Sequence, residues 1–349
     1  MNALPPTAPV SDATILQVEK LSVTFSGQGS RLLALDDVSF AVQRGEIVSL
    51  VGESGCGKSV TAMAIMGLLP RHAARVTADA MRLGDTDLHH ASERQLRGVR
   101  GNRIGMVFQD PMSSLNPVHT VGMQIAEVVR RHRRVSRAEA DRRALEMLDL
   151  VRIPDARSRL HAYPHELSGG MRQRVMIAIA LACDPELLIA DEPTTALDVT
   201  VQAQILDLIR DLRGQLGMSV ILIPHDLGVV AATADRMMVM YAGRIVEGGA
   251  TQAIFARPSH GYTAGLMQSL PAQGHAHRAP LSEIPGSVPR LERSAIGCAF
   301  APRCRFATED CRAPLPPPVA VAAGHTAHCI RPDAVFDAIR SNEVVRQWA

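Results

Sequence analysis

The sequence predicts an α/β protein whose core is a doubly wound sheet, and three observations lead to this fold class. Over residues 15–270, strand-forming runs alternate with helix-forming runs. The runs at 187–190 and 220–223 are short and wholly apolar, as expected of parallel strands that helices cover on both faces. A third apolar run, Ile47–Val51, leads through a glycine-rich turn into a helix that we expect to reach about Leu69.

Further elements continue this alternation. Residues 103–108 form another predicted strand, and residues 120–150 form an arginine-rich helical region. We interpret its arginines as a solvated helix face, with binding to anionic lipid headgroups as the alternative. After residue 270 the pattern changes, because residues 271–295 contain several Pro and Gly with little periodicity, which is typical of a linker. The helix after Asp198 has apolar residues at the spacing of a core-facing helix, at Val201, Ile205, Leu208, Ile209 and Leu212.

Composition and charge exclude several classes of protein. The chain has 349 residues and a formal net charge of +2, whereas nucleic-acid-binding proteins usually have a strongly basic face. No apolar run approaches the roughly 18 residues that cross a bilayer. Residues 1–13 lack the basic and apolar regions of a signal peptide, and we expect them to be disordered. We therefore expect a cytosolic chain that needs a partner for any role at a membrane.

A phosphate-binding loop is predicted between the strand at 47–51 and the helix after it. Residues 52–59 match the pattern G-x-x-x-x-G-K-[ST], in the strand–turn–helix context that this motif requires. The glycines let backbone N–H groups face inward, and the helix N-terminus adds a positive dipole end. Lys58 is expected to reach the β- and γ-phosphates, and the Ser59 hydroxyl to ligate Mg²⁺. The predicted nucleotide contacts are Gly52, Glu53, Ser54, Gly55, Cys56, Gly57, Lys58, Ser59 and Val60.

Two acids follow the apolar strand at 187–190. Asp191 and Glu192 would lie at the carboxyl edge of the sheet, where α/β proteins bind ligands. Asp191 is expected to hold Mg²⁺, directly or through water, and Glu192 to orient or deprotonate an attacking water. Alone, such a pair could equally be solvated surface, but the phosphate-binding loop favours the catalytic interpretation.

A second glycine-containing helix start lies at Leu167-Ser168-Gly169-Gly170-Met171-Arg172-Gln173. Ser168 is expected to cap this helix, which continues to about Cys183. One interpretation is an ordinary capped helix without a ligand. The other is a second anion-binding helix N-terminus, which the glycines permit because the backbone can approach a ligand closely. This segment resembles the signature of the ABC ATPase family, and other motifs of that family are present in order.

The resemblance covers about residues 15–270. Phe25 lies where the family has an aromatic residue that stacks on adenine, and Gln109 resembles the Q-loop glutamine that senses Mg²⁺ and the transporter partner. Asp198, in Ala196-Leu197-Asp198, resembles the D-loop aspartate. His225 resembles the switch histidine near the γ-phosphate, although Pro224 stands where the family commonly has a small hydroxyl residue.

This resemblance implies a fold, cofactors and a mechanism. The fold is a P-loop ABC ATPase domain at 14–270, with a mixed sheet core, an antiparallel β subdomain and a helical signature subdomain at about 110–183. A small cysteine-containing extension occupies residues 271–349. The implied cofactors are ATP and Mg²⁺, with Ser59, Gln109 and Asp191 as metal ligands and Glu192, His225 and Gln109 as catalytic residues. Two such domains face each other, so each ATP also meets the partner's signature, which here comprises Ser168, Gly169, Gly170 and Gln173.

Four of the six cysteines, Cys298, Cys304, Cys311 and Cys329, lie in the last fifth of the chain. Their spacing lacks the C-x2-C pairs of structural zinc sites and leaves a [4Fe–4S] cluster, zinc or no metal open. The motifs around them resemble the C-terminal extension of dipeptide and oligopeptide importer ATPases, some of which have an iron–sulfur cluster there. The resemblance implies a [4Fe–4S] cluster that holds this small segment together.

The same resemblance implies an ATPase subunit that powers a membrane importer of di- and oligopeptides. The implied partners are a second, related ATPase subunit, two integral-membrane permeases and, indirectly, a periplasmic or surface binding protein, with no nucleic acid. The subunit would lie peripherally on the cytoplasmic face of the inner membrane, where residues 109–127 would contact a permease. The alternatives are an importer of nickel or another small solute, a soluble ABC ATPase acting on ribosomes or DNA, and a non-catalytic assembly partner, against which Glu192 argues.

Overall fold

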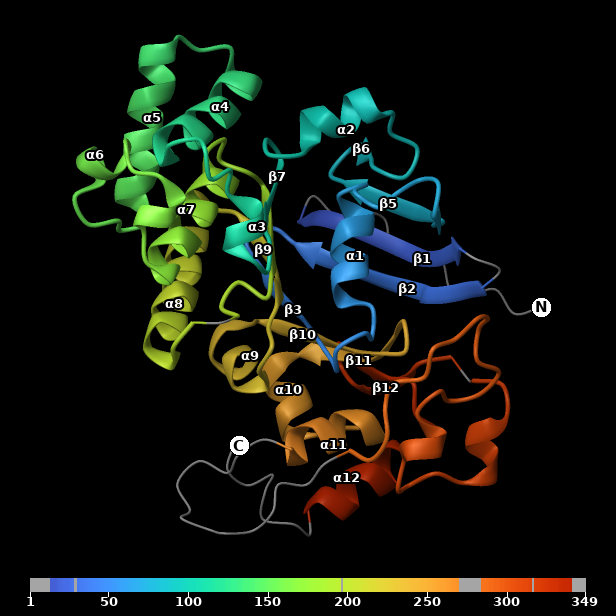
Figure 1. Ribbon diagram of the computed structural model, residues 1–349. Helices are drawn as coiled ribbons and strands as arrows, with labels where there is room; N and C mark the ends of the chain where they lie inside the picture. Colours follow the sequence, from blue (N-terminus) through green and yellow to red (C-terminus); the bar gives the residue numbers. More distant parts are fainter. Residues whose placement is uncertain (1–12, 28–29, 196, 270–283, 316, 341–349) are drawn as a thin grey trace.

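The computed structural model describes residues 13–27, 30–195, 197–269, 284–315 and 317–340, which form two sheets and the helices around them (Figure 1). The stretch 1–13, predicted to be disordered, lies outside the described residues apart from Ala13. No helix in the described ranges is long and apolar enough to cross a membrane.

The main sheet has the strand order β12-β13-β11-β10-β3-β9-β8-β7. Its central strands pair in parallel, and three of them, β3, β8 and β9, are buried along their whole length. This confirms the predicted parallel core, because strands with helices on both faces consist of apolar residues throughout. The parallel strands are β3 (Ile47–Val51), β7 (Ile104–Val107), β8 (Leu187–Asp191), β9 (Ser219–Ile223) and β10 (Arg236–Tyr241); β11 (Arg244–Ala250) is antiparallel to β10.

A second, antiparallel sheet packs on the helix that follows β3. Its long strands β1 (Thr14–Gly27) and β2 (Ser30–Gln43) pair with each other. The helix α1 (Lys58–Ile65) shares one apolar core with this sheet and with the main sheet. The shorter elements are β4 (Ala74–Thr77), β5 (Ala80–Leu83), β6 (Thr86–Asp87) and α2 (Glu93–Val99).

The helical region shares a second apolar core with strands of the main sheet. The arginine-rich stretch, predicted as one helical region, forms two helices that turn at Arg134, whose φ of 42° ends the first of them. Five helices of this region begin after a Ser, Thr or Asp whose side chain accepts a backbone N–H, which satisfies an otherwise unpaired donor. The elements are α3 (Pro111–Ser114), α4 (Val121–Arg133), α5 (Arg137–Leu150), α6 (Ala156–Arg159), η1 (Pro164–Glu166), α7 (Gly169–Leu181) and α8 (Val199–Leu216).

The C-terminal extension continues the main sheet instead of forming a separate module after residue 270. Its strand β13 (His325–Ala327) pairs with β11, and β12 (Val319–Ala322) pairs with β13. In Figure 1 the extension, in orange and red, lies at the opposite end of the view from α4 and α5. The other elements are α9 (Leu227–Thr233), α10 (Thr251–Ala256), α11 (Gly261–Gln268), η2 (Ala301–Arg303), η3 (Glu309–Arg312) and α12 (Pro332–Arg340).

A buried carboxylate joins the extension to the sheet. Glu247 on β11 is 1% exposed and accepts hydrogen bonds from the backbone N–H groups of Ser259 and His260, at 2.8 and 2.9 Å. It also accepts one from the Nε2 of His325 on β13, at 2.8 Å. A buried acid needs such partners because its desolvation is costly. The contact therefore fixes β13 against β11.

Candidate active site

The phosphate-binding loop forms where β3 ends and α1 begins. Gly52 has a φ of 151°, and a Cβ there would lie 2.3 Å from the Met240 carbonyl oxygen, so only glycine fits. Lys58 is 7% exposed, and its Nζ donates to the carbonyl oxygens of Gly52 and Glu53, at 2.7 and 3.1 Å. The loop thus curves around the ammonium group.

A hydroxyl and a carboxylate of the kind that bind Mg²⁺ lie next to this loop. Ser59 Oγ, at the start of α1, donates to Asp191 Oδ1, at the end of β8, over 3.0 Å. Burial raises the pKa of Asp191, and the Ser59 hydrogen bond acts against that rise. These two oxygen ligands fit the hard Mg²⁺ ion of a nucleotide complex.

Glu192 is held in a defined orientation at the edge of the same cleft. Its Oε2 accepts a hydrogen bond from Gln109 Nε2 at 2.6 Å and one from Thr195 Oγ1 at 3.1 Å. Its backbone has a φ of 47°, which is uncommon for a residue with a side chain, and its N–H donates to the Ile223 carbonyl at 2.8 Å. Such a conformation is maintained when the surrounding contacts over-determine it, and it occurs often in active sites.

One cleft brings most of the predicted nucleotide contacts together. It lies between the ends of β1 and β2, the phosphate-binding loop and the loops that follow β7 and β8. Glu192 and the predicted metal ligand Gln109 both line it. The other predicted residues that line it are Phe25, Ser54, Gly55, Gly57, Lys58, Ser59 and Val60.

Other predicted contacts of the loop face away from the cleft. Cys56 is fully buried. The Glu53 side chain pairs with Arg303 of the C-terminal extension at 3.0 Å, and the Glu53 N–H donates to Tyr262 Oη at 2.6 Å. Neither partner was predicted from the sequence. Nothing in the sequence marked Arg303 or Tyr262 as a neighbour of the loop, since contacts across 250 and 209 residues arise only in the folded chain.

The signature segment does not line this cleft. Ser168 and Gly169 are exposed at the start of α7, where the Ser168 hydroxyl accepts the Met171 N–H at 3.4 Å. Gly170 is required by packing, because a Cβ there would lie 2.8 Å from Val201 Cγ1 on α8. Gln173 is 1% exposed, and its Nε2 has no hydrogen-bond partner among the residues that the structure describes. The predicted contact of Gln173 with a partner's nucleotide stays a prediction.

The remaining predicted residues lie on loops beside the cleft. His225 is exposed after β9, the strand between β3 and β8, and it does not line the cleft. Pro224, before it, is buried. Asp198 is exposed and caps α8 by accepting the Val201 N–H at 2.9 Å. Next to it, Val199 is an apolar side chain that is 83% exposed. Asp198 is thus seen in a capping role, and nothing in the single chain tests its D-loop role.

The four cysteines of the extension gather around one small, mostly apolar cavity. Cys298, Cys304, Cys311 and Cys329 all line it and are free thiols. Burial raises the pKa of Cys298, Cys304 and Cys329, the last to about 11, so these thiols stay protonated in this arrangement. Within the described residues, no three His, Cys, Asp or Glu side chains are grouped closely enough to hold a metal ion.

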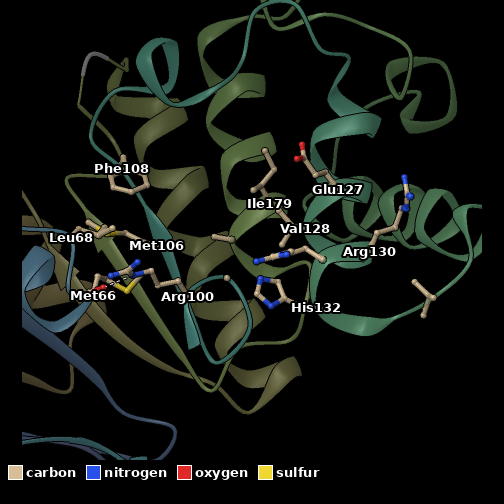
Figure 2. Close-up of a pocket in the computed structure, with 14 residues that line it drawn as sticks. Met66, Leu68, Arg100, Met106, Phe108, Glu127, Val128, Arg130, His132 and Ile179 are labelled. Carbon is tan, nitrogen blue, oxygen red and sulfur yellow. Dashed lines mark hydrogen bonds between the residues drawn. The ribbon is translucent and has the colours of Figure 1, made fainter. Parts of the chain in front are cut away.

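A groove lies between the part of the main sheet that includes β7 and the helical region (Figure 2). It has a volume of about 890 Å³ and lies between the end of α1, β7 and the helices α4 and α7. Leu68 and Phe108 are 40% and 42% exposed in it, which is unusual for large apolar side chains. The charged side chains along it are mostly basic, at Arg100, Arg130 and Arg131, with Glu127 as the acid. His132 also lines the groove, and burial lowers its pKa, which favours the neutral ring.

Comparisons with protein families agree with this geometry. The family described as "ABC transporter" matches residues 35–195, which include the phosphate-binding loop, Glu192 and the signature segment. The family described as "Oligopeptide/dipeptide transporter, C-terminal region" matches residues 246–311. The second match begins within β11 and includes three of the four clustered cysteines.

Individual relatives match nearly the whole chain. A protein of Sinorhizobium fredii, described as a probable peptide ABC transporter ATP-binding protein, is 56% identical over 95% of this chain and 96% of its own. A putative peptide import ATP-binding protein of Brucella abortus is 52% identical over 92% and 98%.

Solved structures with the same fold include a dimeric ATP-binding cassette in a post-hydrolysis state with ADP and Pi. It has a TM-score of 0.61 and 28% identity, and the match covers 68% of this chain and 98% of that one.

Proposed function

This chain belongs to the ATP-binding proteins of ABC transporters, and from that premise we propose how its cleft powers the import of peptides. The subunit binds and hydrolyses ATP and energises a peptide importer. The observation that supports this most directly is the convergence of Lys58, Ser59 and Glu192 on one cleft.

Within one subunit, each group has a distinct task. Backbone N–H groups of the phosphate-binding loop and the Lys58 ammonium bind the phosphates. Ser59 and Asp191 would hold Mg²⁺, which neutralises charge on the phosphate oxygens. Glu192 accepts a proton from, or orients, the water that attacks the γ-phosphorus, and its hydrogen bond from Gln109 holds it in place. We assign His225 to the γ-phosphate once a second subunit closes the site.

We propose that a second ATPase subunit faces the cleft and that it is a related but non-identical chain. Two features support a facing partner. The capped helix start at Ser168 and Gly169 is exposed and turned away from the chain's own cleft. Val199 exposes 83% of its surface next to Asp198, and such an apolar side chain suits an interface. A helix N-terminus supplied by the partner would add positive potential at the γ-phosphate.

We propose that the groove in Figure 2 receives a short helical segment of a membrane permease. Its exposed Leu68 and Phe108 fit an apolar helix face, and its surplus of basic side chains fits an acidic residue on that helix. Phe108 lines the groove and immediately precedes Gln109. A permease helix that displaces Phe108 would therefore also move Gln109, which donates to Glu192. In this proposal the subunit lies on the cytoplasmic face of the inner membrane, and a substrate-binding protein acts through the permeases.

The docking proposal has a direct test. Leu68→Glu should abolish co-purification of permeases in detergent, while the isolated subunit keeps its ATP affinity. Ile296→Glu, at an apolar position of the extension that is 72% exposed, is the matched control and should retain the permeases. Retention of permeases by Leu68→Glu would rule out this groove as the docking site.

We also propose that the four cysteines of the extension hold a [4Fe–4S] cluster. The support is that all four line one cavity in a segment with few buried apolar residues. Among the described residues, the thiols do not lie close enough together to bind a metal ion. Cluster binding therefore requires that the loops bring them closer. It also requires that the thiols lose their protons. Iron, sulfide and zinc assays on anaerobically purified full-length protein test this. Absence of both iron and sulfide would contradict it.

The import function is tested in the assembled transporter. Proteoliposomes with the permeases, both ATPase subunits and the binding protein should take up a labelled dipeptide only with ATP. Lys58→Ala should abolish both uptake and hydrolysis, because the phosphates lose their main cation. Uptake of nickel in place of peptides would identify the alternative cargo, and undiminished hydrolysis by Lys58→Ala would overturn the assignment of the site.

A further inference from the structure

Residues 287–291 of the C-terminal extension line the nucleotide cleft. Ser287, Val288, Pro289, Arg290 and Leu291 face the same cavity as Phe25 and the phosphate-binding loop. The sequence predicted a linker over 271–295. Residues 270–283 lie outside the described residues, but residues 284–295 pack on the catalytic domain. This part of the extension is therefore placed where a bound nucleotide would touch it.

Two hydrogen bonds fasten the end of this segment to β2. The Leu33 N–H donates to the Leu291 carbonyl at 2.7 Å. Ser294 Oγ donates to Asp36 Oδ1 at 2.8 Å, and the Asp36 carboxylate, which is buried, also accepts from Arg244 Nε at 2.7 Å. The segment is thus held against the strand that forms the cleft wall.

Arg303 fastens the start of the segment. Its Nε donates to the Pro285 carbonyl at 2.7 Å, and its Nη2 donates to the carbonyls of Ile284 and Gly286, at 3.3 and 3.2 Å. Gly286 has a φ of 80°, which suits the turn there. One guanidinium therefore binds three successive carbonyl groups and sets the direction in which residues 287–291 leave the turn.

The same guanidinium also holds the phosphate-binding loop. Arg303 Nη1 lies 3.0 Å from Glu53 Oε2, and the Arg303 side chain is only 9% exposed. Tyr241 Oη accepts from Nη1 at 3.3 Å. Because a half-buried, well-partnered ion pair resists separation better than an exposed one, Arg303 fixes the distance between the phosphate-binding loop and the segment 287–291.

Part of the resulting cleft wall is apolar. Phe25 and Leu32 are directly opposite each other in the β1–β2 pair. Leu33 continues this wall and is bonded to Leu291, next to which Val288 and Pro289 line the cavity. A surface of one aromatic ring and several aliphatic side chains fits a flat heteroaromatic base, which is bound by stacking and apolar contact.

We propose that residues 287–291 form part of the base-binding surface of the nucleotide site, with Arg303 as the positioning residue that sets this surface relative to the phosphate-binding loop. The extension is then a component of the nucleotide site as well as of the main sheet. This inference rests on the proposed ATPase function, because it assigns a further surface to the same site.

The test compares ligands with and without a base. Full-length Val288→Ala should bind ATP and ADP on the order of fivefold more weakly, because two methyl groups leave an apolar contact. Its affinity for tripolyphosphate, which has phosphates but no base or ribose, should be unchanged. Ile296→Ala, at the exposed position of the same extension, is the control and should bind all three ligands as the wild type does.

The two variants test the base-binding surface and the ATPase site separately. Unchanged ATP affinity in Val288→Ala, or an equal loss of ATP and tripolyphosphate affinity, would overturn the base-binding surface. Lys58→Ala tests the site itself. If Lys58→Ala weakens ATP binding and Val288→Ala does not, only the present inference fails. If Lys58→Ala binds ATP as the wild type does, the proposed ATPase site fails.

Discussion

The side-chain amide of Gln109 donates a 2.6 Å hydrogen bond to the carboxylate of Glu192. The two residues follow β7 and β8, which are parallel neighbours in the main sheet, so their loops leave the sheet at the same edge. Thr195 donates to the same carboxylate oxygen. Glu192 is thus oriented by groups from two loops, one of which adjoins the groove proposed for the permease.

Glu192→Gln should lower ATP turnover at least a hundredfold, because an amide cannot accept the proton of the attacking water. ATP affinity should remain within a factor of two or so of wild type, since the phosphate-binding loop is untouched. Steady-state hydrolysis and nucleotide binding measure the two effects. Glu309→Gln, at a side chain that is 85% exposed, is the control. Wild-type turnover by Glu192→Gln would show that another group is the base.

Ser59→Ala should raise the Mg²⁺ concentration that gives half-maximal hydrolysis by about tenfold, equivalent to the loss of roughly 1.4 kcal/mol at one ligand. The Ser59 hydroxyl lies 3.0 Å from Asp191 Oδ1. Its removal leaves Asp191 as the remaining ligand of this proposed pair. A Mg²⁺ titration of hydrolysis makes the measurement. Nucleotide binding without Mg²⁺ is the internal control and should not change. An unaltered Mg²⁺ requirement would exclude Ser59 as a ligand.

Glu247→Ala should lower the free energy of unfolding by about 3 kcal/mol, because it leaves two buried N–H groups and His325 without their acceptor. Urea denaturation measures the loss. Glu309→Ala removes a carboxylate of the same extension that is 85% exposed, and it should change stability little. Equal stability of the two variants would mean that the junction between β11 and β13 contributes little.

Stability should fall as the pH is lowered from about 6.5 towards 3, in part because of His260. Burial, followed by the nearby His328, lowers the pKa of His260 from 6.5 to about 3 in the folded chain. Between these values the unfolded state binds the proton and the folded state does not, so acid favours unfolding. The His260 ring accepts the Tyr262 N–H, and its other nitrogen lies 3.8 Å from Cys298 Sγ.

The comparison of variants isolates this residue from the acids that also titrate in that range. Urea denaturation of His260→Gln between pH 4 and pH 7 should show a shallower loss of stability than the wild type. His161→Gln, at an exposed histidine, should keep the wild-type slope. If stability falls with pH equally steeply in all three proteins, folding does not lower the pKa of His260.

Local patterns in the sequence determined the catalytic half of this protein. The strand β3 has the predicted bounds, and β8 and β9 each differ by one residue, because a short, mainly apolar run between a turn and a helix has few other ways to fold. Glycine and lysine spacing identified the loop around Lys58, since phosphate binding depends on the local backbone. The parallel sheet then brought Gln109, Asp191 and Glu192 to one edge.

Only the tertiary structure decided what the C-terminal extension does. The sequence predicted a linker and a small cysteine-containing extension but not its contacts: β13 pairs with β11, and Arg303 binds Glu53. Neither contact leaves a local pattern. A strand of three residues has almost no periodicity, and an ion pair across 250 residues depends on how distant elements pack. The same reason explains the burial of Gln173, which depends on how distant elements pack.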